Sequence, residues 1–231
     1  MKPDKPKKSN PLLEIIFNVA LPSWLLMKFS GPEDLGVVLG LITALAFPIG
    51  YAIYDYARTR ETNLISVFGF FSILLTGGIA LFELNVQWLA IKEASIPGLI
   101  SVFVILSGMY GKPLIAKILL NESILKVDMV YKKLDELNKT NEFRNKMTFA
   151  NKLLALTFVF SSIMNYLLAK WLVTSPAGTT LFNEELGHMT LMSYPVIAIP
   201  SMIMLIGLFV YVAKVIKGLT GYTFSELIID Q

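Results

Sequence analysis

The sequence predicts an all-α fold, an integral membrane bundle of six transmembrane helices with both termini in the cytoplasm. Composition is the first observation, because the 231-residue chain is 55% hydrophobic and 16% charged, with a mean hydropathy of +0.62. Soluble domains carry about 25% charged residues. The second observation is that the apolar residues form long blocks, and the third is that Lys and Arg gather in alternate connections between these blocks.

The blocks are long enough to span a membrane, since a helix crosses the hydrocarbon core with about 20 residues. Six segments meet this requirement, namely 11–27, 36–56, 63–82, 88–110, 148–172 and 191–215. The first contains Glu14 and Asn18 and follows a basic start, as the apolar part of a signal peptide does. No small-residue cleavage site follows it, so we expect it to be retained as a membrane helix.

The basic residues predict the orientation, because Lys and Arg are enriched in cytoplasmic connections. They precede the first segment, separate the second from the third, recur throughout the connection after the fourth and close the sixth. Trp24, Trp88 and Trp171 fall at the opposite boundary, where Trp favours the interface. The predicted organisation is a basic cytoplasmic N-terminus (1–10), helices 1–4 (11–110), a cytoplasmic segment (111–147), helices 5–6 (148–215) and a cytoplasmic tail (216–231).

The 111–147 segment has the pattern of an amphipathic helix. Val127, Val130, Leu134 and Leu137 recur at helical spacing, and acidic residues precede basic ones by four positions in several places. We expect this helix to lie along the cytoplasmic surface, with its apolar side toward lipid or the bundle and its basic residues near anionic headgroups. A groove for a protein partner is the alternative.

Ionisable and amide side chains inside the spans are the candidate site residues, because such groups are costly in a bilayer. Lys92 and Glu93 lie about 6–8 Å below the outer edge of the fourth helix, and Asn165 has a comparable depth on the fifth, about 10 Å by the helical rise. The second candidate layer lies in the cytoplasmic third and contains Glu14, Asn18 and Asp55, with Asn151 and Lys152 at a similar depth. Both layers suit either a polar cavity or local structural pairing.

Span 3 carries a stripe of small residues, Gly69, Ser72 and Thr76. Small residues at this spacing allow two membrane helices to approach closely. We therefore interpret the stripe as a packing surface and not as a binding site.

Several kinds of chemistry are excluded or disfavoured. Cysteine is absent, which excludes disulfides, thiolate catalysis and Cys-ligated metals. Phosphate-loop, zincin and hydrolase-elbow motifs are absent as well. Glu184 and His188 share a helical face, but a metal site needs three or four ligands. We therefore expect no cofactor, no metal and no enzymatic activity, and the basic residues form no patch for nucleic acid.

One run carries a family resemblance. YGKPLIAKILLNESI, with the preceding WLAIKEASIPGLISVFVILSG, resembles the bacterial intracellular septation protein A family, whose fourth hydrophobic segment contains a lysine and leaves through a KPL motif. The matching positions are Lys92, Lys112, Pro113, Leu114 and Asn165. The resemblance covers about residues 40–215, and the chain departs from it in a longer 121–147 insertion and in its NPLLEIIFNVALPS opening. These departures are typical of a sister group.

The resemblance implies a multi-pass bacterial inner-membrane protein with a non-enzymatic part in cell-envelope integrity and membrane homeostasis. Its partners would be the lipid bilayer and envelope or division membrane proteins, with a homo-oligomer as a further possibility. A small secondary transporter, with a polar cavity between two inverted three-helix halves, is the alternative that the candidate layers favour. A membrane enzyme acting on lipid is disfavoured because no acid–base constellation is present.

Overall fold

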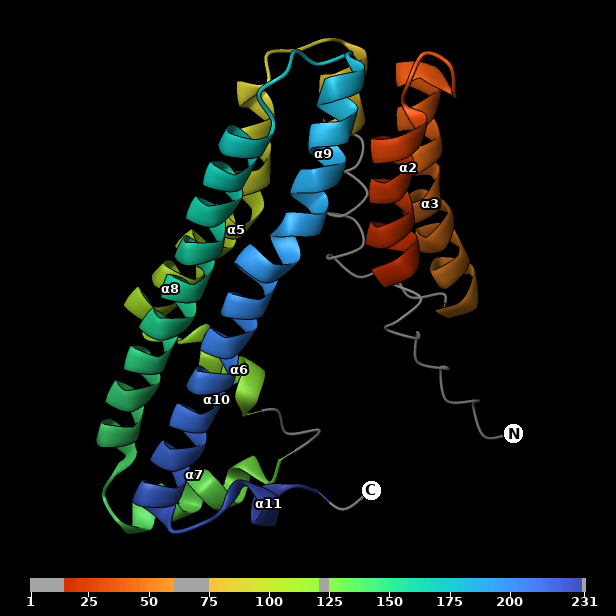
Figure 1. Cartoon of the computed structure of the whole chain (residues 1–231). Helices are drawn as coiled ribbons and strands as arrows, with labels where there is room; N and C mark the ends of the chain where they lie inside the picture. Colours follow the sequence, from red (N-terminus) through yellow and green to blue (C-terminus); the bar gives the residue numbers. More distant parts are fainter. Residues whose placement is uncertain (1–14, 60–74, 121–124, 230–231) are drawn as a thin grey trace. The chain divides into compact units, whose positions relative to one another are not determined.

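The computed structural model describes residues 15–59, 75–120 and 125–229 (Figure 1). All regular elements of these residues are helical, apart from one antiparallel bridge between Leu125 and Ile228. The elements are the π-helix η1 (Ile16–Ala20), α2 (Leu21–Phe29), α3 (Gly36–Thr59), α5 (Gln87–Met109), α6 (Leu114–Leu119), α7 (Val127–Glu136), α8 (Thr140–Leu172), α9 (Thr180–Ser193), the π-helix η2 (Tyr194–Ala198), α10 (Ile199–Thr220) and α11 (Phe224–Leu227). Residues 75–81 are also helical.

Four helices in the described residues are long and apolar enough to cross a membrane. They are Gly36–Tyr54, Gln87–Met109, Thr140–Leu172 and the continuous helix Thr180–Thr220. The predicted helical class is therefore confirmed for these residues, and the four helices are compatible with a membrane protein. The first expected span corresponds to a shorter apolar helix, Ile16–Phe29, and most of the third lies outside the described residues. Six spans and the orientation stay predictions.

The connection expected on the outer side before the last span is helical in the structure. Thr179 begins α9 by accepting a hydrogen bond from the Phe182 amide at 3.2 Å. Glu185 accepts hydrogen bonds from the backbone N–H groups of Thr174 (2.8 Å) and Ser175 (2.9 Å). This carboxylate of α9 therefore satisfies backbone donors of the turn that precedes its own helix.

The helix that continues from α9 has more residues than one span needs. It contains 41 residues, whereas about 20 are enough to cross the hydrocarbon core. The π-helix η2, which contains Pro195 and is followed by Pro200, joins α9 to α10. Proline removes an amide donor from the helix, and a π-turn is one way in which the backbone accommodates that loss.

The described chain forms two compact units. The first comprises Met1–Ala94 and Met164–Val196. Within it, α2 packs against both α3 and α9 (Figure 1). Gly187 permits the approach of α9 to α2, since a Cβ atom at that position would lie 2.8 Å from the Ser23 carbonyl oxygen. Asn183, fully buried on α9, donates to Ser30 Oγ at 3.0 Å and to the Val37 carbonyl at 2.9 Å.

The second unit comprises Ser95–Ile163 and Ile197–Gln231 and has a contiguous hydrophobic core. Helix α7 contributes Val127, Val130 and Leu134 to this core and packs against α10. The amphipathic pattern therefore forms the expected helix, and its apolar side faces the protein interior. Leu137 lies just beyond the end of α7 and is exposed. Helix α8 begins at Thr140, eight residues before the expected span.

The C-terminal segment, expected to be a cytoplasmic tail, packs into the same core. Gly221 ends α10 in the left-handed conformation at φ +83°. Thr223 and Glu226 then form a capping box that begins α11. Leu227 is fully buried, and its carbonyl accepts a hydrogen bond from the Lys126 amide at 2.8 Å. These residues therefore belong to the folded unit.

Candidate functional site

The outer candidate layer is centred on Lys92 of α5. Its Nζ atom lies 2.5 Å from Glu93 Oε1 and donates a second hydrogen bond to Thr76 Oγ1 at 2.7 Å. The side chains of Lys92 and Glu93 are only 10% and 23% exposed, and Thr76 is buried. Thr76 belongs to the predicted small-residue stripe, whose other members, Gly69 and Ser72, lie outside the described residues. Thr76 therefore provides a hydrogen-bond partner, a role that the packing interpretation did not include.

This arrangement neutralises the lysine within its own unit. The ammonium has a carboxylate and a hydroxyl as acceptors, and the contact joins α5 to the 75–81 helix. Charged side chains in a membrane are stabilised by such partners. The geometry therefore favours structural pairing of Lys92 and Glu93.

The other predicted site residues come from several helices. Asn165 is half-buried on α8, in the same unit as Lys92 and Glu93, and Asn18 is exposed on η1. Asp55 falls on α3, but its side chain is outside the described part of the structure, and so is Glu14 altogether. The inner layer drawn from Glu14, Asn18 and Asp55 therefore stays a prediction.

A different amide organises the polar contacts of the second unit. Asn151 of α8 is 1% exposed. Its Nδ2 donates to the Val104 carbonyl at 2.6 Å and to Ser107 Oγ at 3.3 Å, and its Oδ1 accepts from the Ile115 amide at 3.2 Å. Gly108 leaves room for this side chain, because a Cβ there would lie 2.8 Å from Nδ2. One amide thus joins α8 to α5 and α6.

The KPL motif lies in the turn that this amide supports. Helix α5 ends with the Gly111 amide donating to Gly108 O (3.1 Å) and the Lys112 amide to Ser107 O (3.0 Å). Gly111 has φ +69°, so the turn is a Schellman motif, in which a left-handed residue satisfies the last carbonyls of a helix. Pro113 then precedes the first residue of α6.

The Leu114 amide completes the turn by donating to Ser107 Oγ at 3.2 Å. Ser107 in turn donates its hydroxyl proton to the Val104 carbonyl at 2.7 Å. Lys112, Pro113 and Leu114 are therefore held in place by helix-capping chemistry, which leaves the Lys112 side chain exposed.

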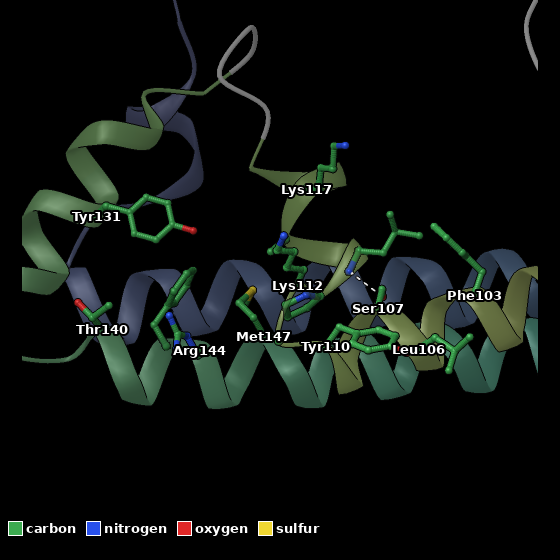
Figure 2. Close-up of a pocket in the computed structure, with 15 residues that line it drawn as sticks. Phe103, Leu106, Ser107, Tyr110, Lys112, Lys117, Tyr131, Thr140, Arg144 and Met147 are labelled. Atoms are coloured by element: carbon green, nitrogen blue, oxygen red, sulfur yellow. Dashed lines mark hydrogen bonds between the residues drawn. The ribbon is translucent and has the colours of Figure 1, made fainter.

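A groove of about 680 Å³ borders this turn, entirely within the second unit. It is lined by the inner end of α5, the turn, α6, Tyr131 of α7 and the start of α8. Figure 2 shows Phe103 and Leu106 at one end, Tyr131, Thr140 and Arg144 at the other, and Lys112 between them. The groove therefore has an apolar end and a polar, basic end.

The charge of the groove has one sign. Its lining includes Lys112, Lys117 and Arg144, all exposed, and none of its fifteen lining residues is acidic. Within the described residues, none of these three basic side chains has an ion pair. Exposed cations beside an apolar wall are suited to an anionic amphiphile.

Comparison with known proteins identifies no relative. No family model, no curated protein and no solved structure matches the chain. The function must therefore be inferred from the residues of this chain.

Metal binding finds no support among the described residues, where no three His, Cys, Asp or Glu side chains come together. His188 is exposed on α9 and Glu184 is half-buried on the same helix. Within that part of the chain the candidate chemistry is ion pairing at Lys92 and anion binding at the groove.

Sequence reasoning identified Lys112 by resemblance and named Asn151 as a polar residue of the inner layer, but missed both the groove and the bonds of Asn151. The sequence did contain one signal for the turn at the end of α5, because a glycine followed two residues later by a proline is a typical helix stop. Gly111 and Pro113 have this spacing, and Gly111 is left-handed in the structure. The groove itself combines residues separated by up to 44 positions, from Phe103 to Met147. Hydrophobic periodicity carries no information on such distant contacts.

Proposed function

We propose that the protein is a multi-pass protein of the bacterial cytoplasmic membrane that maintains envelope integrity and membrane homeostasis without catalysing a reaction. Both termini are cytoplasmic in this proposal, in keeping with the distribution of Lys and Arg. The partners would be lipids and other membrane proteins of the envelope or division machinery, and a homo-oligomer would be compatible with the exposed apolar helix faces.

The observation that carries the proposal is the internal pairing of Lys92. Its bonds to Glu93 and Thr76 give the ionisable groups of α5 a structural role in joining two helices. The surfaces that remain for partners are then the apolar helix faces, exemplified by Leu99 (68% exposed) and Ile203 (62% exposed). Such faces contact acyl chains or other membrane helices.

Kinship with the septation protein A-like family is part of the proposal, as an uncharacterised sister group. The KPL turn supports it, because Lys112, Pro113 and Leu114 occupy a capped connection whose geometry depends on Gly111 and Ser107. In this chain the motif therefore has a structural role in the turn.

The first test is complementation of a deletion strain under envelope stress. Wild type, Glu93→Gln and Lys92→Met are compared at matched membrane levels. We expect folded Glu93→Gln protein to rescue, because a structural pair acts through stability alone. Abundant, folded protein that fails to rescue would contradict the structural role.

The second candidate function is a small secondary transporter, and one observation favours it. Lys92 and Glu93 form an ionisable pair inside a span-length helix, and such pairs recur on ion pathways. In this case Glu93→Gln abolishes solute flux in proteoliposomes at unchanged abundance. The complementation and flux assays together separate the two functions.

The cysteine-free sequence allows the topology to be tested directly. Pro176→Cys lies in the connection between α8 and α9, and Lys132→Cys lies on α7; both native residues are exposed. We expect a membrane-impermeant maleimide to label position 176 but not position 132 in spheroplasts. Labelling of position 132 alone would reverse the orientation.

A further inference from the structure

We propose that the groove at the end of α5 binds one anionic phospholipid from the leaflet it faces. This inference rests on the lipid contacts in the proposed function and names their chemical class. The phosphate would lie beside Lys112 and Arg144, and an acyl chain would lie along Phe103 and Leu106. All four residues line the same groove of about 680 Å³.

Charge complementarity is the first argument. Two of the basic side chains come from the KPL turn and α6, and the third comes from α8. Three positive charges with no acid in the lining favour a headgroup with net negative charge over a zwitterionic one. The Asn151 contacts hold α8 against α5 and α6, so the elements that carry these cations are positioned before any ligand arrives.

The depth of the groove is the second argument. Met109 ends the span-length helix α5, and Phe103 precedes it by six residues, or about 9 Å along the axis. The apolar end therefore lies at acyl-chain depth, while Lys112 and Lys117 lie beyond the helix end at headgroup depth. Phe103 is 61% exposed and Leu106 is 41% exposed, which leaves their side chains available for an acyl chain.

These two features together distinguish a lipid from a soluble phosphate compound. A soluble anion would use the basic end and leave the apolar wall uncovered. Tyr110, between the two ends, and Tyr131, at the basic end, add aromatic rings with polar tips, as is common at membrane interfaces. A lipid with its headgroup at the basic end and an acyl chain along the apolar end would occupy the whole length of the groove.

The test uses delipidated full-length protein in detergent, with native mass spectrometry as the measurement of bound lipid. Phosphatidylglycerol and phosphatidylcholine with identical acyl chains are titrated separately. We expect phosphatidylglycerol to bind preferentially. The double variant Lys112→Gln/Arg144→Gln should weaken its binding by about thirtyfold, on the scale of one phosphate contact for each basic residue.

Two matched variants control for charge and folding. Lys132→Gln/Lys146→Gln removes the same charge from exposed positions of the same unit that do not line the groove, so phosphatidylglycerol preference should persist. Lys112→Arg/Arg144→Lys keeps both charges and should retain the preference. Should the neutralised variant prove misfolded by circular dichroism, Phe103→Ser provides the second probe, since it should weaken phosphatidylglycerol binding while leaving the cations intact.

Several outcomes overturn the inference. Equal binding of the two lipids does so, as does equal loss in both double variants. Competition by glycerol 3-phosphate as effective as that by phosphatidylglycerol would assign the groove to a soluble phosphate compound. Loss of lipid selectivity with normal complementation would rule out this site and leave the envelope role intact. Normal lipid selectivity with wild-type protein that fails to complement would leave this site intact and rule out the envelope role.

Discussion

The charged pair of the first unit and the buried amide of the second satisfy their polar groups in different ways. In the first unit a charged pair, Lys92 and Glu93, is completed by the hydroxyl of Thr76 and keeps some exposure. In the second unit a neutral amide, Asn151, is buried and bonded to two backbone groups and one hydroxyl. A charge inside a span needs an opposite charge, whereas a neutral amide is satisfied by backbone groups and hydroxyls alone.

This difference affects how strongly each polar feature depends on its surroundings. Neutral amide bonds at a helix end stabilise one geometry, and α5, α6 and α8 meet there around a contiguous core. A partly exposed ion pair responds to both partners and to its surroundings. Asn151 is therefore the more fully buried of the two polar features, and its partner Ser107 lines the groove.

The largest expected effect is that of Asn151→Ala. The change leaves the Ile115 amide without its side-chain partner, and a buried group of this kind costs about 1–3 kcal/mol. The Val104 carbonyl keeps its bond from Ser107, but truncating a side chain that is 1% exposed also leaves a cavity. We expect the free energy of unfolding to fall by about 3 kcal/mol from the two effects together. Denaturation in mixed micelles, followed by tryptophan fluorescence, measures the change.

The control on the same helix is Asn145→Ala, because Asn145 is exposed. This variant should change the free energy by less than about 0.5 kcal/mol. Equal effects of the two substitutions would show that Asn151 has no special role.

Lys92→Met should have the next largest effect. It leaves the Glu93 carboxylate beside a hydrophobic side chain, and breaking a buried pair costs about 3–5 kcal/mol. Because Glu93 keeps 23% of its side-chain exposure, we expect a smaller loss of about 2 kcal/mol. The same denaturation experiment applies.

The double variant Lys92→Met/Glu93→Gln is the informative comparison. Removing both charges should recover at least half of the loss, since no uncompensated charge remains. Additive losses in the double-mutant cycle would indicate that the two side chains act independently.

A smaller effect is expected for Gly108→Ala. The new Cβ would lie 2.8 Å from Asn151 Nδ2 and displace the amide. The gain of about 1 kcal/mol in helix propensity partly offsets this, so the net loss should be about 1 kcal/mol. Gly207→Ala has no neighbour within 4 Å of the new Cβ and should be neutral or stabilising. Thermal unfolding of the two variants side by side measures the difference, and a stabilised Gly108→Ala would contradict the proposed contact.

The smallest effect is a pH dependence of α11. Hydrogen bonds from the Thr223 backbone amide (2.7 Å) and hydroxyl (2.8 Å) hold the pKa of Glu226 below its usual value of 4.5. A lowered folded pKa means that the capping box contributes fully above pH 4.5 and loses its contribution as the pH falls through the folded pKa. Amide hydrogen exchange of 224–228 should therefore accelerate, relative to the rest of the chain, only below about pH 4.5.

Glu226→Gln should remove this pH dependence, and Thr223→Ala should raise exchange at every pH. Unchanged acid behaviour in Glu226→Gln would assign the effect to another group.

The sequence by itself determined the helical class and the approximate positions of four long apolar helices. These properties depend on local transfer free energy, because each span needs enough consecutive apolar residues and no distant partner. The amphipathic face of 127–134 followed from spacing alone for the same reason. Gly111 and Pro113 also carry a local signal for the end of a helix, since both residue types are typical of helix stops.

The tertiary structure decided which groups meet. Thr76 joins Lys92 across 16 positions, Asn151 reaches Val104 across 47, and Leu227 enters a core whose other members begin at Val104. Short polar segments such as 180–190 and 221–229 carry weak local preferences, so burial of Phe182 and Leu227 against distant helices determined their structure. The groove exists only because three helices converge on one buried amide.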